Sequence, residues 1–265
     1  MTDDSQPDTG NEAFWRDYLN NPDSMQKFGR RVFSRIPSSP RCRQCGAPFT
    51  GPGGRMMRLI GKRQSTRNPN MCNTCSTFML EHHGGAEVEA SLLFADIRGS
   101  TTMAEGMSPG EFHAVLDRFY TAASSAVFSH DGLVDKFVGD ELVAVFPPMW
   151  GDQHPAHAIG AAQALLRATG HADAGGAWVP VGAGVHTGRM WFGAVGVGGH
   201  TELTVVGDTV NTAARLASRA EAGEILVSLG AAAAAGLDPT LERRSLELKG
   251  KAEATEVVAL RIRPE

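Results

Sequence analysis

The fold is decided by two stretches of sequence, Ser91-Leu-Leu-Phe-Ala-Asp-Ile-Arg-Gly-Ser-Thr101 and Val134-Asp-Lys-Phe-Val-Gly-Asp-Glu-Leu-Val143. The first is an apolar run that ends at Asp96 and a Gly-Ser-Thr turn, and the second predicts a tight hairpin around Gly139-Asp140. If the two turns meet, Asp96 and Asp140 supply a pair of hard oxygen ligands suited to Mg²⁺ or Mn²⁺. The backbone N–H groups of residues 98–101 would then be free to cradle a triphosphate.

Strands and helices alternate on both sides of these stretches. We expect a hairpin over 133–146, strands over 87–97, 203–206, 225–228, 241–248 and 257–263, and two strands within 179–195 that join at Gly188. Helices are expected over 77–83, 108–129, 156–170 and 231–235, and over 209–220 with Asp208 as its cap. This order predicts an α+β fold with a ferredoxin-like core.

The N-terminal part differs in composition from the rest of the chain. Residues 11–36 predict an amphipathic helix with a break at Asn21-Pro22, and Gly51-Pro-Gly-Gly54 predicts a turn. Between Ser24 and Leu80 there are eleven Lys and Arg residues and no Asp or Glu. A segment of this kind can bind an anionic partner or dock on the acidic remainder of the chain, where we expect it to tune activity.

All four cysteines lie inside the basic segment, as Cys42-x-x-Cys45 and Cys72-x-x-Cys75. This spacing predicts a zinc-ribbon-like segment with a tetrahedral Cys₄ site, and we favour structural Zn²⁺. An iron–sulfur cluster and a pair of disulfides are the alternatives that four thiols leave open. His82 and His83 are alternative ligands, but we expect them to face solvent.

From residue 90 to residue 260 the chain resembles the class III nucleotidyl cyclases. The resemblance rests on four blocks in one order: FADIRGST, DKFVGDELVAVF, VGAGVHTGRMWFGAVG, and VVGDTVNTAARLAS followed by GEILVS. It implies the ferredoxin-like cyclase fold, a homodimer, and conversion of a nucleoside triphosphate to a cyclic nucleotide. It also implies two Mg²⁺ or Mn²⁺ ions per active site, held by Asp96, the backbone carbonyl of Ile97 and Asp140.

The remaining site residues also follow from the resemblance. Asn211 would orient the ribose and Arg215 would stabilise charge on the α-phosphate, and their spacing of four places both on one helix face. The opposite face, with Val210, Ala213, Ala214 and Ala217, would pack on the sheet, and Arg219 would lie on the surface. In the family the two metal ligands come from one subunit and Asn211 with Arg215 from the other, so we expect two composite sites per homodimer.

Substrate recognition is expected at six further positions. Lys136 and Thr204 would read the base, with Lys136 on the strand face that carries Val134 and Val138. The Lys ammonium donates to adenine N1, and the Thr hydroxyl can accept from the adenine amino group. Gly99, Ser100 and Thr101 would bind the triphosphate. Lys249, or else Lys251, would contact it too, whereas Gly182 replaces a basic residue found in many relatives.

These observations predict an adenylate cyclase that makes cyclic AMP from ATP for intracellular signalling. Its parts would be an N-terminal helix (1–36), a basic CxxC module (37–84) and a catalytic domain (85–265). A guanylate or mixed-specificity cyclase is the first alternative, and the second is a non-catalytic dimeric module or a zinc module that binds nucleic acid or an anionic membrane. No stretch of about 18 apolar residues occurs and the N-terminus is acidic, so we expect a cytoplasmic protein without a transmembrane helix.

Overall fold

The structure is a computed structural model that describes residues 9–20, 33, 40–196, 201–248 and 254–262. The chain divides into two compact units. The first unit takes its residues from the chain up to Val88, from Pro148–Gly151 and from Trp191–Val206. The second unit comprises Glu89–Pro147, Asp152–Met190 and the chain from Gly207 onward. The expected boundary at residue 84 stays a prediction.

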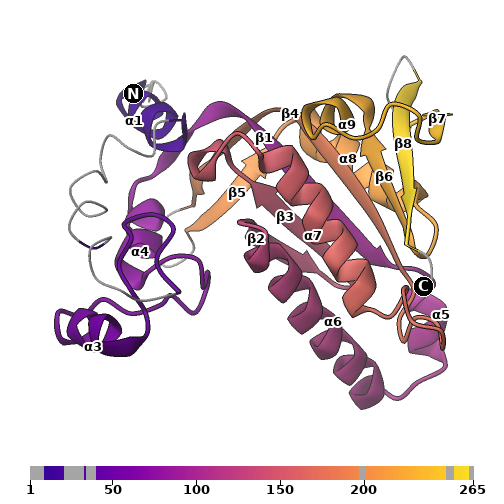
Figure 1. The fold of residues 1–265 in the computed structure, drawn as a ribbon, viewed down its shortest axis with the longest axis horizontal. Helices are drawn as coiled ribbons and strands as arrows, with labels where there is room; N and C mark the ends of the chain where they lie inside the picture. The colour runs from indigo at the N-terminus through magenta and orange to yellow at the C-terminus, as the bar shows by residue number, and fades with distance from the viewer. Residues whose placement is uncertain (1–8, 21–32, 34–39, 197–200, 249–253, 263–265) are drawn as a thin grey trace, which may run out of the picture. The chain divides into compact units, whose positions relative to one another are not determined.

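Eight strands form the sheet, in the order β2-β3-β1-β4-β6-β8-β7 with β5 paired to β4 (Figure 1). Their bounds are β1 (Gly84–Ile97), β2 (Leu133–Val138), β3 (Glu141–Phe146), β4 (Val181–Val195), β5 (Glu202–Val206), β6 (Glu224–Ser228), β7 (Arg243–Leu246) and β8 (Thr255–Arg261). β4 and β6 are parallel, whereas β1 and β3, β2 and β3, and β6 and β8 are antiparallel. The predicted α+β fold is confirmed.

Helices cover both faces of the sheet in the second unit. The core on one face joins Ile225 and Val227 of β6 to buried residues of α6 (Pro109–Ser129) and α7 (His154–Ala168). Leu226, between them, packs instead with Leu216 of α8 (Asp208–Arg219). Because successive strand residues point to opposite faces, α6 and α7 lie on one side of the sheet and α8 on the other. Figure 1 shows α6 and α7 side by side on their face.

The long helix α6 begins where the sequence predicts. Ser108 accepts a hydrogen bond from the backbone N–H of Glu111, whose side chain bonds back to the N–H of Ser108. This capping box satisfies two donors that a helix start otherwise leaves without partners. Two short helices, α5 (Ser100–Glu105) and α9 (Leu229–Ala234), complete the second unit.

The first unit combines α1 (Thr9–Asn20), α3 (Gly51–Leu59), α4 (Asn73–Glu81), the 3₁₀ turn η1 (Pro148–Trp150), β5 and the neighbouring ends of β1 and β4. Trp15 of α1 is fully buried, and its indole N–H donates to the carbonyl of His82 at 3.0 Å. Its ring meets Phe192 of β4 edge-on, with 6.3 Å between centroids. Within the described residues, no helix is both long and apolar enough to cross a bilayer.

Several boundaries differ from those expected. Strand β4 runs through Gly188 without interruption, because that glycine makes room for Thr209, whose Oγ1 would lie 3.1 Å from an added Cβ. Helix α8 begins at Asp208, and its cap is Gly207, which has φ +143°. Residues 51–54, expected as a turn, open α3, while α4 starts at Asn73 because Cys72 caps it. Of the helix expected over 11–36, α1 accounts for residues up to 20, and most of the remainder lies outside the described residues.

Close backbone approach fixes α8 against β4. A Cβ on Gly184 would lie 2.7 Å from the carbonyl oxygen of Ala213 and 2.8 Å from the carbonyl carbon of Leu216. We therefore expect Gly184→Ala to lower the free energy of unfolding by about 1–3 kcal/mol, because backbone atoms of α8 would have to move. Urea unfolding measures this change. Gly110→Ala is the matched control, since its Cβ meets nothing within 4 Å, and equal stability of the two variants would contradict the packing account.

Candidate active site and metal centre

The two acidic residues predicted from the sequence come together at one end of the β1–β3 pair. The register places Asp96 opposite Glu141. Asp140 directly precedes Glu141, in the two-residue turn that Gly139 opens with φ +61°. The carboxyl group of Asp140 lies close enough to Asp96 to raise its pKa. The predicted hairpin and the predicted meeting of the two turns are therefore both found.

The environment of this acidic pair favours a positive charge. Burial, followed by the hydrogen bond with Asp140, raises the pKa of Asp96 to about 7, although the Arg98 guanidinium opposes the shift. Burial, followed by the charge of Asp140, also raises the pKa of Glu141. The Oδ2 atom of Asp140 is buried and has no hydrogen-bond partner among the described residues. A buried carboxylate oxygen without a partner is costly, and a cation would satisfy it.

Arg98 holds a central position that the sequence did not reveal. Its guanidinium forms an ion pair with Asp96, and its Nη1 donates to the carbonyl of Ser218 in α8 at 3.3 Å. Arg98 thus supplies the positive charge beside Asp96 and ties the end of β1 to α8. A cation next to an acidic pair is the signal that could have identified it.

The acidic pair fits a divalent cation. Two carboxylates with an unsatisfied oxygen form the donor set that Mg²⁺ and Mn²⁺ prefer. The side chain of Ile97 is aliphatic and buried, so only its backbone carbonyl could join the ligands, and this role stays a prediction.

The predicted triphosphate cradle is smaller than expected. The N–H of Arg98 already donates to the carbonyl of Pro180 at 2.8 Å, so it is not free. Gly99 has the left-handed φ of +71° and precedes α5, whose first residues are Ser100 and Thr101. The N–H groups in the first turn of a helix lack intrahelical partners, so these positions retain the predicted capacity to bind phosphate.

Helix α8 presents Asn211 on its exposed side and Arg215 half-buried, four residues apart. The Nη1 atom of Arg215 is buried without a hydrogen-bond partner among the described residues. No described contact joins Asn211 or Arg215 to Asp96 or Asp140 within this one chain. The packing face of α8 differs in part from the expected one: it is made by Thr209, Thr212, Ala213, Leu216 and Ala217. Arg219 is exposed, as predicted.

Lys136 shares only part of the strand face predicted for it. A bulge at Asp135 places Val134 opposite Ala144 but Lys136 opposite Val143. Because Ala144 and Val143 are neighbours on β3, Lys136 shares its face with Val138 and not with Val134. The side chain of Lys136 is 41% exposed, and its Nζ lies 3.7 Å from a carboxylate oxygen of Asp135.

The other predicted substrate contacts either belong to the first unit or lie outside the described residues. Thr204 is half-buried in β5, opposite Gly193 of β4, and belongs to the first unit. Lys249 and Lys251 lie outside the described residues. Gly182 stands where an added Cβ would lie 2.7 Å from the carbonyl oxygen of Ala220, which explains why a larger residue is absent from this position.

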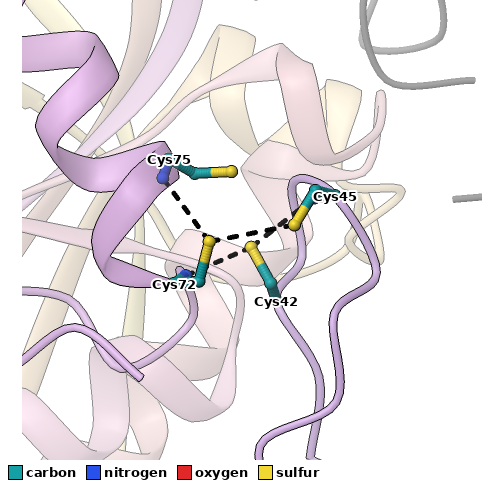
Figure 2. A group of neighbouring side chains, drawn as sticks. All are labelled: Cys42, Cys45, Cys72 and Cys75. Atoms are coloured by element: carbon teal, nitrogen blue, oxygen red, sulfur yellow. Dashed lines mark hydrogen bonds between the residues drawn. The ribbon is translucent and has the colours of Figure 1, made fainter. Parts of the chain in front are cut away.

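The four cysteines of the first unit converge, as predicted (Figure 2). Their sulfur atoms all lie within 4.8 Å of one another, and none forms a disulfide. Backbone N–H groups of Cys45 and Cys72 donate to the Cys42 sulfur at 3.5 and 3.2 Å, and that of Cys75 to the Cys72 sulfur at 3.4 Å. Such donors stabilise thiolates, and the cluster is positioned to hold a metal ion.

The thiols of the cysteine cluster influence one another's pKa, and the two neighbouring histidines lie outside the cluster. Hydrogen bonding with Cys42 lowers the pKa of Cys45 to about 7, and hydrogen bonds from the neighbouring thiols lower that of Cys72 as well. His82 does not take part, because its ring stacks on Phe14 and its Nδ1 lies 2.7 Å from the carbonyl oxygen of Phe78. His83 is exposed, as expected.

Comparison with known proteins shows which family the chain resembles. Residues 85–260 match the family model for the adenylate and guanylate cyclase catalytic domain. Adenylate cyclase 1 of Rhizobium meliloti is 35% identical over 144 residues, which are 51% of this chain and 22% of that protein. Adenylate cyclase of Anabaena cylindrica is 34% identical over 131 residues, 48% of this chain and 26% of that protein. The chain thus spans about a quarter of the length of these curated relatives.

Solved structures give the same result for the fold. The guanylyl cyclase Cya2 aligns with a TM-score of 0.61 and 26% identity, over 66% of this chain and 93% of that one. The adenylyl cyclase CyaB of P. aeruginosa aligns with a TM-score of 0.58 and 23% identity, over 66% of this chain and 95% of that one.

The raised pKa of Asp96 predicts pH-dependent metal binding. Below pH 7 the folded protein holds a proton on this carboxyl, so a cation must displace it. With the cysteine cluster saturated with Zn²⁺, we expect Mn²⁺ to bind about tenfold more tightly at pH 8 than at pH 6, as one carboxyl with a pKa near 7 requires. Isothermal titration calorimetry measures both affinities.

The raised pKa of Asp96 also determines how the stability of the fold changes with pH. A carboxyl whose pKa is raised on folding stabilises the metal-free protein at low pH, and this contribution is lost as the pH rises through about 7. Added Mn²⁺ should oppose that loss. Asp96→Asn should remove both the tight binding and its pH dependence, and a variant that binds Mn²⁺ like the wild type would contradict the assignment.

Proposed function

The chain belongs to the family of adenylate and guanylate cyclase catalytic domains, and we propose that it is an adenylate cyclase that converts ATP to 3′,5′-cyclic AMP and pyrophosphate. The observation that carries this proposal is the half-buried pair of Asp96 and Asp140, with the unsatisfied oxygen of Asp140, inside the matched region. Such a pair would bind divalent cations, and these cations would in turn bind the negatively charged triphosphate. Cyclic AMP formation for intracellular signalling is part of the same proposal.

The reaction requires the ribose 3′-oxygen to attack the α-phosphorus in line as pyrophosphate leaves. Bound Mg²⁺ or Mn²⁺ would neutralise phosphate charge and lower the pKa of the 3′-hydroxyl. Asp96 and Asp140, with the Ile97 carbonyl, would hold the ions. Asn211 would orient the ribose, and the guanidinium fork of Arg215 would bind oxygens on the α-phosphate as charge develops there.

Two observations support an active site shared between two copies of the chain. No described contact brings Asn211 or Arg215 to the acidic pair within one chain, and Arg215 keeps a buried Nη1 without a partner among the described residues. A homodimer would join the acidic pair of one subunit to Asn211 and Arg215 of the other. It would then contain two composite sites, and a monomer would be inactive.

Base recognition is assigned to Lys136 and Thr204. The ammonium of Lys136 matches the acceptor N1 of adenine, and the hydroxyl of Thr204 can accept from the adenine amino group. The two named adenylate cyclases at 34–35% identity favour ATP. A hydroxyl can also donate to guanine O6, so discrimination against GTP should be weaker than with a pure acceptor. A guanylate or mixed-specificity cyclase is therefore the alternative function, and the similarity to the guanylyl cyclase Cya2 favours it.

Zn²⁺ is the metal that we propose for the cysteine cluster. Four thiols on two CxxC turns, with their sulfur atoms within 4.8 Å of one another, would form a closed tetrahedral site of the kind typical of structural zinc. The cluster lies in a well-packed surrounding: Tyr18 is 4% exposed, and the Gln44 side chain accepts a hydrogen bond from the Trp150 indole at 3.1 Å. Helix α4, which Cys72 caps, contacts β5, the strand that carries Thr204. Zinc would thus stabilise the unit that includes this substrate contact.

The function is tested by incubating the purified protein with ATP or GTP and Mn²⁺, and identifying the products by mass spectrometry. We expect cyclic AMP as the main product. Asp96→Ala should reduce its formation by at least about 10³-fold, because the protein would lose a ligand for the cations that would neutralise charge on the phosphates. Cyclic GMP as the main product would favour the alternative, and full activity of Asp96→Ala would overturn the proposal.

Complementation tests the shared site. Asp96→Ala and Arg215→Ala should each be inactive, yet a mixture should regain up to about a quarter of the wild-type activity. Half of the dimers in an equal mixture are mixed, and each of these holds one intact site. A mixture as inactive as its components would show that each chain builds its own site.

Metal analysis tests the cysteine assignment. The wild-type protein should contain one Zn²⁺ per chain, and Cys42→Ser should lose it and unfold at a temperature at least several degrees lower. His83→Ala is the control, because this exposed neighbour should leave the metal content unchanged. Iron and sulfide in the purified protein, or disulfides in place of metal, would contradict zinc.

A further inference from the structure

Helix α3 turns large apolar side chains toward solvent. Met56, Leu59 and Ile60 are 47%, 88% and 61% exposed, and they follow one another along the helix and its C-cap. The opposite side of α3 is buried through Gly53, Gly54 and Met57. An amphipathic helix on a protein surface normally presents polar residues to water, so this exposed apolar cluster calls for a partner.

The helix is held firmly in this orientation. Gly54 packs so closely on the carbonyl group of Phe49 that a Cβ would clash with it. At the other end, the N–H groups of Gly61 and Lys62 donate to the carbonyls of Arg58 and Met57 at 3.1 and 2.8 Å. These two bonds form a Schellman motif, which stops the helix at Ile60 and leaves that side chain at its tip.

The cysteine module anchors the same tip. Asn73, the residue after Cys72, donates from its side chain to the carbonyl of Gly61 at 3.0 Å. Its side-chain oxygen accepts from the N–H of Arg63 at 2.9 Å. The exposed apolar residues are therefore presented by a fixed scaffold.

Basic residues accompany the apolar cluster. Arg55, Arg58 and Arg63 are exposed and lie next to it in the sequence, and the Nη1 of Arg58 donates to the carbonyl of Phe49 at 3.2 Å. No Asp or Glu occurs between Ser24 and Leu80 to neutralise them. We call Met56, Leu59 and Ile60, together with these three arginines, the α3 patch.

We propose that the α3 patch docks on the surface of an anionic lipid membrane. Met56, Leu59 and Ile60 would enter the boundary between headgroups and acyl chains, while the arginines would contact lipid phosphates. The arrangement combines the two signals that peripheral membrane binding requires, buried apolar area and positive charge. Docking would hold the enzyme at a membrane surface, and it is independent of which nucleotide the enzyme cyclises.

The patch suits other partners less well. A second copy of the same patch would bring arginines against arginines, which opposes self-association through this surface. Nucleic acid would satisfy the arginines, but phosphates offer nothing to three large aliphatic side chains, and base contacts would be expected from aromatic ones. An anionic bilayer satisfies both the apolar and the basic half of the patch.

Vesicle co-sedimentation of the full-length protein tests the proposal. Vesicles of phosphatidylcholine with about one-third phosphatidylglycerol should bind the protein, pure phosphatidylcholine vesicles should bind it far less, and salt should weaken binding. The double variant Leu59→Ser/Ile60→Ser should lose affinity for anionic vesicles by at least about tenfold, because the inserted aliphatic area is gone. The double variant Arg55→Glu/Arg63→Glu should also lose affinity for anionic vesicles, because it replaces positive charges with negative ones.

Met107→Ser is the matched control, since Met107 is an exposed methionine (39%) outside the patch, and it should bind like the wild type. Cyclase activity of each variant in the absence of lipid should equal that of the wild type, which shows that folding is intact. No binding to anionic vesicles, or unchanged binding by the Leu59→Ser/Ile60→Ser variant, would overturn the proposal. Patch-dependent self-association or DNA binding without vesicle binding would equally overturn it, in favour of those partners.

Discussion

The antiparallel register between β1 and β3 brings the acidic side chains of the site together. Asp96 lies opposite Glu141, so the turn that precedes Glu141 places Asp140 beside Asp96. A shift of one residue would turn every side chain of the strand to the other face. The buried residues that flank Asp96 on β1, Ala95 and Ile97, leave such a shift no low-energy alternative. The packing of the core thus fixes the position of the carboxylates.

The acidic pair in turn constrains its surroundings. Burial of the Asp96 carboxyl and the neighbouring carboxyl of Asp140 both disfavour a negative charge on Asp96, and its raised pKa reflects this cost. Arg98 offsets part of it and connects β1 to α8. The glycines of β4 allow α8 to approach the sheet closely, which positions the helix of Asn211 and Arg215. A bound cation would satisfy the remaining oxygen of Asp140.

Much of this arrangement can be predicted from the sequence. Where a part cannot be predicted, there is a physical reason. The hairpin was predictable because apolar residues alternate on both sides of Gly139-Asp140, and α6 because Ser108 and Glu111 form a capping box. The bulge at Asp135, which separates Lys136 from the face of Val134, is set by pairing with β3 and leaves no mark in the local pattern. The expectation that two strands join at Gly188 is wrong, because a glycine needed for packing and a glycine needed for a turn look alike in one sequence. The bond from the Arg98 N–H to Pro180 likewise depends on contacts between distant segments.

Anomalous X-ray diffraction from crystals grown with Mn²⁺ and a non-cyclisable ATP analogue would test the central claim most directly. We predict a manganese peak between the carboxylates of Asp96 and Asp140, next to the triphosphate, with Asn211 and Arg215 of a second subunit facing the ribose and α-phosphate. Manganese bound elsewhere, or a nucleotide that does not reach the two carboxylates, would contradict the account.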